Sequence, residues 1–149
     1  MKKIFLIALI SCFGFSCNKD FQTESIFMVT NNSSHFVKLK VFGVIHQNGQ
    51  ELTDTNFKIP HGQSVTIDYS IKTGEKDVDT DPMTEPFVPV DSALILFDDT
   101  LGIMYKPSDT NSRNILKKSS YTGGKTDKRV FRYLYSITDE DYIKAVRIK

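Results

Sequence analysis

Val65–Lys72 has the sequence VTIDYSIK, in which apolar and polar residues alternate at every position. Successive side chains of a β-strand point to opposite faces, so this alternation predicts a strand with one face buried and the other in water. Val37, Leu39 and Val41 alternate with lysines in the same way. Both stretches indicate half-buried strands whose apolar sides face a core.

Similar signals recur along the chain and predict about seven or eight short strands. Ser25–Thr30 is β-branched and aromatic, and the turn-forming residues Asn31–Ser34 follow it, so we expect it to pair with Val37–Ile45 as a hairpin. Ala93–Phe97 is apolar throughout, which is typical of a central strand covered on both faces. Further strands are predicted at Phe57–Ile59, Leu101–Tyr105 and Val130–Ile137, and Gly123–Thr126 is interpreted as a hairpin turn.

A single helix is predicted. Thr138 followed three residues later by Asp141 is the pattern of a capped helix start, and we expect a brief helix over Asp139–Ala145. A parallel α/β sheet needs crossover helices, for which the chain has no room. The sequence therefore predicts an all-β fold, an Ig-like antiparallel β-sandwich with a short C-terminal helix and one long loop at Thr73–Pro89.

The beginning of the chain has the features of an export signal. Two lysines precede the apolar run Ile4–Phe15, which is shorter than the about 20 residues of a spanning helix and matches a signal-peptide core. Gly14–Cys17 then resembles a bacterial lipoprotein lipobox, which implies that Cys17 becomes the first mature residue and carries acyl chains. A rival box ends at Cys12, and an ordinary signal peptide or an apolar first strand are further interpretations.

These boundaries divide the chain into a signal peptide at residues 1–16, a lipidated tether at 17–24 and a β-sandwich domain at 25–149. The lipobox, the Thr30–Ser34 turn and the closing stretch Tyr135–Tyr142 resemble small uncharacterised lipoproteins of the Bacteroidota. The resemblance implies a protein held on the outer membrane through Cys17, facing either the periplasm or the cell surface, and it implies no activity. More than one acyl chain is needed for stable anchoring, since each buried CH₂ contributes about 0.8 kcal/mol.

Charge and cysteine content exclude several functions. The formal net charge is +1, so the chain lacks the basic excess that draws in nucleic acid. Its two cysteines are Cys12 and Cys17, so the expected domain has no thiol for a disulfide, a nucleophile or a thiolate metal site. We expect no cofactor.

Two sets of residues carry possible metal ligands. Asp77–Asp81 alternates three carboxylates as a calcium loop does, but Pro82 and Val88 stand where an EF-hand needs Gly and Glu. A solvated acidic loop is the alternative interpretation. The histidines lie in or beside predicted turns, although their spacing does not favour zinc. They are His35, His46 and His61.

Catalytic chemistry has little support in the sequence. Asp98 and Asp99 follow a buried strand, where paired carboxylates could serve acid–base catalysis, but neighbours in a turn usually point to different sides. No serine lies in a Gly-x-Ser-x-Gly motif. We therefore predict that the protein is not an enzyme, with a hydrolase as the alternative.

Three features could contact other molecules. Leu116–Arg132 is locally basic and could touch anionic glycans or lipid headgroups, or form a solvated hairpin that keeps edge strands from pairing. The segments around Ser92 and Thr100 resemble the Asp-Ser/Thr-apolar motif at which Bacteroidota attach O-glycans, with Thr100 the more accessible. Several tyrosines could stack on sugars, although most are expected in the core. They are Tyr69, Tyr105, Tyr121, Tyr133 and Tyr135.

Together these features predict a lipid-anchored envelope lipoprotein that acts as a non-catalytic binding module for a protein or glycan partner. A structural or accessory subunit of an outer-membrane assembly is the alternative. Coplanar exposed aromatic side chains would favour the glycan binder, and an uncovered apolar face would favour the assembly subunit.

Overall fold

A computed structural model describes residues 21–47, 50–74, 79–83, 85–87 and 89–148. Nine strands of this part form sheet A, with the order β4-β1-β8-β7, and sheet B, with the order β3-β2-β5-β6-β9. The strands are β1 Phe21–Asn31, β2 Val37–Gln47, β3 Gln50–Ile59, β4 Ser64–Gly74, β5 Val90–Phe97, β6 Leu101–Tyr105, β7 Thr122–Asp127, β8 Val130–Ile137 and β9 Val146–Arg147. The helices are the 3₁₀ turn η1 at Lys118–Ser120 and α1 at Asp139–Lys144.

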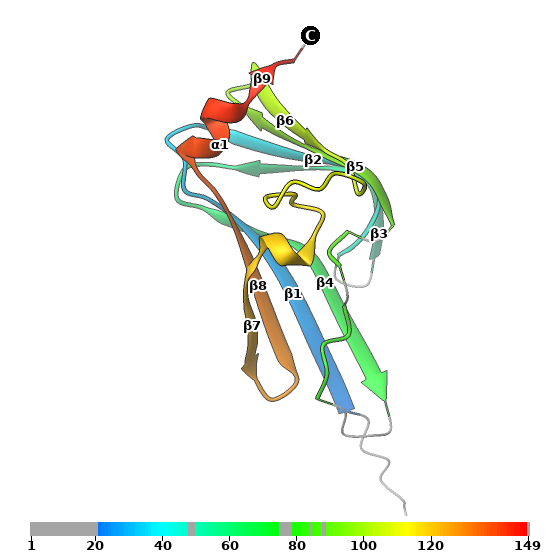
Figure 1. The fold of residues 1–149 in the computed structure, drawn as a ribbon. Coiled ribbons are helices and arrows are strands. Elements are labelled where there is room, and N and C mark those ends of the chain that lie inside the picture. The colour runs from blue at the N-terminus through cyan, green and yellow to red at the C-terminus, as the bar shows by residue number, and fades with distance from the viewer. Residues whose placement is uncertain (1–20, 48–49, 75–78, 84, 88, 149) are drawn as a thin grey trace, which may run out of the picture.

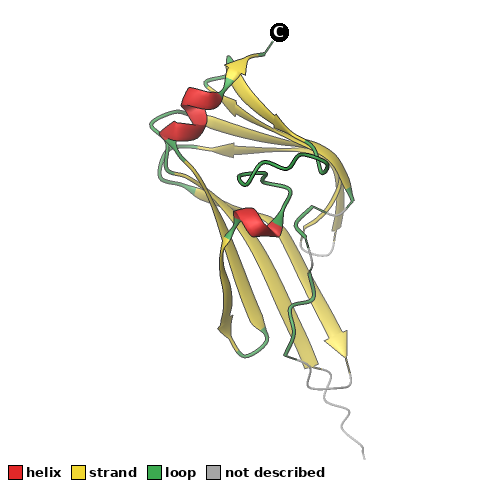
Figure 2. Cartoon of the chain, viewed as in Figure 1, coloured by secondary structure: helices red, strands yellow, loops and turns green. Residues whose placement is uncertain are grey.

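The two sheets pack as a sandwich at one end and diverge toward the other, as Figure 1 shows and Figure 2 repeats by element type. The predicted all-β sandwich with a short C-terminal helix is confirmed. Its core comes from the inward side chains of both sheets, including Phe27, Leu39, Ile95 and Tyr135, each less than 2% exposed. Burying one such side chain contributes about 1.5–3 kcal/mol.

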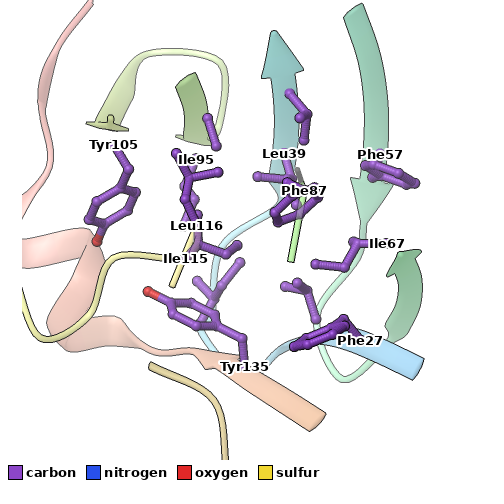
Figure 3. Packing of buried hydrophobic residues seen from close by; sticks show 14 of the residues in the cluster. Phe27, Leu39, Phe57, Ile67, Phe87, Ile95, Tyr105, Ile115, Leu116 and Tyr135 are labelled. Carbon is purple, nitrogen blue, oxygen red and sulfur yellow. The ribbon is translucent and has the colours of Figure 1, made fainter. Parts of the chain in front are cut away.

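Two irregular segments fill the space where the sheets diverge. Phe87 lies in the long loop before β5, and Ile115, Leu116 and Tyr121 lie between β6 and β7, and all four are buried. Figure 3 shows Phe87 and Ile115 among side chains of both sheets. The irregular segments therefore belong to the core, because the strands alone do not close it.

β1 occupies an inner position of sheet A. It pairs antiparallel with β4 and parallel with β8, so the expectation of a purely antiparallel sandwich holds for every strand pair in the described residues except this one. The expected hairpin between the first two strands is wrong, because β2 belongs to sheet B. The chain turns a corner from sheet A to sheet B after β1. The buried Asn31 side chain explains this corner, since its amide donates to the carbonyls of His35 and Ile59 at 2.8 Å.

The later elements lie close to their predicted positions. β6 and β8 have the predicted bounds, Ala93–Phe97 is buried on both faces, and α1 begins with the Asp141 carboxylate accepting the Thr138 N–H at 2.9 Å. The hairpin turn expected at Gly123–Thr126 is wrong, because these residues form β7 and the turn follows them. Gly123 has φ +119°, and a Cβ there would lie 2.2 Å from the Arg132 carbonyl oxygen, so β7 requires glycine at this position.

Candidate binding surface

Three exposed apolar side chains gather on the outer face of sheet B. Met104 is 45% exposed, Val146 66% and Ile148 40%. Val146 pairs with Gly102, and paired residues share a face, so alternation along β6 and the C-terminal segment puts all three side chains on one side. We call Met104, Val146 and Ile148 the C-terminal patch. Figure 1 shows this end of the chain opposite the end at which β1 begins.

Gly102 lets the C-terminal segment pack closely against the sheet. A Cβ on Gly102 would lie 3.0 Å from Ile148 Cγ1, from Leu94 Cδ1 and from the Ile95 carbonyl oxygen. The Ile148 N–H also donates to the Thr100 carbonyl at 3.2 Å. The absence of a side chain at Gly102 therefore lets Ile148 pack directly on the outer face of the sheet.

An ion pair between a buried aspartate and a partly exposed arginine anchors α1, the helix that precedes β9. Asp141 is 1% exposed, and its carboxylate accepts two hydrogen bonds from Arg113, from Nε at 2.8 Å and from a terminal nitrogen at 2.6 Å. The Asp141 hydrogen bonds raise the pKa of the Arg113 guanidinium above its usual range. Arg113 also donates to the Ser136 carbonyl at 2.7 Å, so the pair ties α1 to the segment that follows β6.

The carboxylates expected after β5 diverge in the structure. Asp98 and Asp99 have φ of +48° and +59°, as a type I′ turn requires. Asp98 contacts His35 Nδ1 at 2.6 Å, and the hydrogen bond from His35 lowers the pKa of Asp98. Asp99 instead accepts from Lys38 at 2.6 Å. The two carboxylates thus have separate partners and do not form an acid–base pair.

His35 and His61, the two histidines whose side chains the structure describes, have separate partners. His35 stacks on Tyr142 with ring centroids 3.5 Å apart, and His61 Nδ1 lies 2.6 Å from the Ser33 carbonyl oxygen. The side chain of His46 lies outside the described residues. Over the described ranges, no three His, Cys, Asp or Glu side chains converge as metal ligands.

The acidic loop is hydrogen-bonded to sheet A. Burial opposes ionisation of Asp81, but the hydrogen bonds that its carboxylate accepts from Lys118, Ser25 and Tyr133 together outweigh it, so the pKa of Asp81 is lowered. Asp79 accepts from Lys125, which lowers its pKa. Asp77 lies outside the described residues. The two described carboxylates therefore fasten the loop to the sheet rather than pointing toward a common centre.

The ion pairs of Lys118 and Lys125 bear on the basic segment identified in the sequence. Lys118 and Lys125 belong to the basic segment Leu116–Arg132, but each pairs with an aspartate of the loop. Of the two interpretations of this segment, contact with an anionic partner is therefore less well supported for these two side chains.

The remaining predicted residues are distributed as follows. Four of the candidate sugar-stacking tyrosines are at most 9% exposed, so the stacking surface that they would form is not present. They are Tyr105, Tyr121, Tyr133 and Tyr135. Thr100 is exposed in the turn after β5 and Ser92 is half-buried within β5. Cys12, Cys17 and the side chain of Tyr69 lie outside the described residues.

One cavity of about 210 Å³ lies between the two irregular segments. Its walls are mostly apolar, with Pro86, Phe87 and Leu116 among them, and its charged lining residues are Glu85 and Lys117. This volume is below the about 300–1,000 Å³ of typical small-molecule sites, and one carboxylate does not provide an acid–base pair.

A comparison of the chain with protein-family models and with curated proteins finds no match. None of the helices in the described ranges is long and apolar enough to cross a bilayer. The C-terminal patch was not predicted from the sequence, because an apolar residue at Val146 or Ile148 has the same pattern as a core residue.

Proposed function

We propose that the chain is a lipid-anchored envelope lipoprotein whose sandwich is a non-catalytic module for binding a protein partner. The observation that carries this proposal is the C-terminal patch, an uncovered apolar surface on β6, β9 and Ile148 that follows the helix α1, which the Arg113–Asp141 pair anchors. Adjacent exposed apolar side chains commonly mark protein-interaction sites. A glycan partner is less well supported, because the described candidate tyrosines are buried.

The position of the patch supports display away from a membrane. The proposed anchor at Cys17 lies four residues before Phe21, where β1 begins. β1 contains 11 residues, which at 3.2–3.4 Å per residue extend about 35 Å. An anchor at Cys17 would thus hold the opposite end of the sandwich in the aqueous phase.

Labelled-palmitate incorporation tests the anchor. Wild-type protein and the Cys12→Ala control are expected to incorporate label, whereas Cys17→Ala is expected to incorporate none and to leave the membrane fraction. Equal labelling of Cys17→Ala and wild type would remove Cys17 as the lipidation site and refute the lipoprotein proposal.

The same uncovered surface also favours the alternative of an accessory subunit in an outer-membrane assembly. Native gels of detergent-solubilised membranes separate the two functions. A permanent subunit migrates only in a large complex, and Val146→Ser/Ile148→Ser releases it, whereas a binding module migrates largely as the free protein.

A further inference from the structure

The outer face of sheet B continues from the C-terminal patch into a row of lysines. Val37 and Leu39 of β2 point into the core, so Lys38 and Lys40 point outward. In the strand register, Lys38 lies opposite Lys58 of β3 on one side and opposite Leu96 of β5 on the other. The face therefore changes from basic on β3 and β2 to apolar on β5, β6 and the C-terminal segment.

Two aspartates at the margin of this face already have partners. Asp99 accepts from Lys38, and Asp54 accepts the Gly43 N–H at 3.1 Å. Within the part of the chain that the structure describes, Lys40 and Lys58 form no ion pair, and Lys58 is exposed. Lys38 is already paired with Asp99, so Lys40 and Lys58 are the lysines of this row that remain for the carboxylates of a partner.

We infer, building on the proposed function, that this face docks a protein whose surface presents apolar side chains bordered by carboxylates. The apolar part of that surface would cover the C-terminal patch, and its carboxylates would meet Lys40 and Lys58. Charge complementarity of this kind mainly accelerates association and fixes orientation, while the buried apolar area contributes affinity.

Two other occupants fit the face less well. A second copy that docks through the same face would bring its lysine row onto the first lysine row or onto the apolar patch, and neither arrangement places a carboxylate on Lys40 and Lys58. The anchoring membrane is too far away, because the chain from Cys17 to Phe21 reaches about 14 Å, against the about 35 Å of β1.

Site-specific photo-crosslinking in cells tests the inference with the full-length chain. A photoreactive amino acid replaces Met104, and crosslinking is compared in the otherwise wild-type chain, in Lys40→Glu/Lys58→Glu, in Lys40→Arg/Lys58→Arg and in Lys72→Glu. Lys72 is an exposed lysine of β4 in the other sheet, so its reversal is the matched control. Equal thermal unfolding of the four proteins shows that the substitutions leave the fold intact.

We expect one protein adduct whose yield falls at least tenfold in the double Glu variant and is kept in the double Arg variant and in Lys72→Glu. Reversing carboxylates on the crosslinked protein to lysine is expected to restore the adduct with the double Glu variant. An adduct with phospholipid, an adduct between two copies, a yield unaffected by charge reversal, or no adduct would each overturn the inference. Palmitate labelling is read separately, so failure of the anchor and failure of the docking face are distinguishable.

Discussion

Replacing Asp141 with Asn tests how the C-terminal patch is held in place. The substitution keeps the size of the side chain but removes its charge and replaces one of its two accepting oxygens with an NH₂ group, so the two Arg113 bonds and the Thr138 N–H bond are not all kept. Removing one partner of a buried ion pair costs about 3–5 kcal/mol. Because Arg113 is 34% exposed and can be partly rehydrated, we expect about 3 kcal/mol, near the lower limit.

Urea unfolding at pH 7 measures this cost directly, and a domain of this size loses about 2–4 °C of melting temperature per kcal/mol. Glu140→Gln is the matched control, since Glu140 is an exposed carboxylate one residue earlier in α1 and is expected to change stability by less than about 0.5 kcal/mol. The double replacement Arg113→Met/Asp141→Leu removes both charges and should recover much of the loss. If Asp141→Asn and Glu140→Gln have the same stability, the Arg113–Asp141 pair does not hold α1.

The pKa of Asp81 is lowered in the folded chain, so the unfolded chain binds more protons, and stability should be lost as the pH falls below about 4 through the folded pKa. Urea midpoints at pH 7 and pH 3 measure this loss, which should shrink in Asp81→Asn. Gly102→Ala should cost about 1–3 kcal/mol by displacing Ile148. Gly74→Ala, with nothing within 4 Å of the added Cβ, should be nearly neutral. Equal unfolding midpoints of the two variants would contradict the close packing of Ile148 against Gly102. Phe27→Ala removes a fully buried ring that packs on Tyr121 and Tyr133 and should cost about 3–5 kcal/mol in the same assay; a loss below 1 kcal/mol would contradict its central place in the core.

Local patterns in the sequence predict the strands well where turn signals bound them. Leu101–Tyr105 follows Asp98-Asp99, and both aspartates adopt the positive φ of a tight turn, so the hairpin between β5 and β6 is encoded locally. Val130–Ile137 has its aromatic side chains at alternate positions, and the side chains of Phe131, Tyr133 and Tyr135 are all buried.

Long-range pairing is not readable from such patterns. Asn31–Ser34 has the composition of a turn, but composition does not separate a hairpin from a corner between sheets. The corner is distinguished by a long-range contact, because the Asn31 side-chain amide donates to the carbonyl of Ile59 in β3. The candidate site escapes prediction for a related reason, because only the partner strand decides whether the apolar residues at Val146 and Ile148 face the core or the solvent.

The parallel ladder between β1 and β8 has a consequence for the order of folding. Residues of β1 pair with residues more than 100 positions later in the chain. One of the two strands that flank β1 is therefore among the last to be synthesised. Contacts of such separation close slowly because a long loop must be ordered first. Until β8 pairs with it, one edge of β1 remains open to foreign strands, and a factor that shields this edge while the chain folds would raise the yield of native protein.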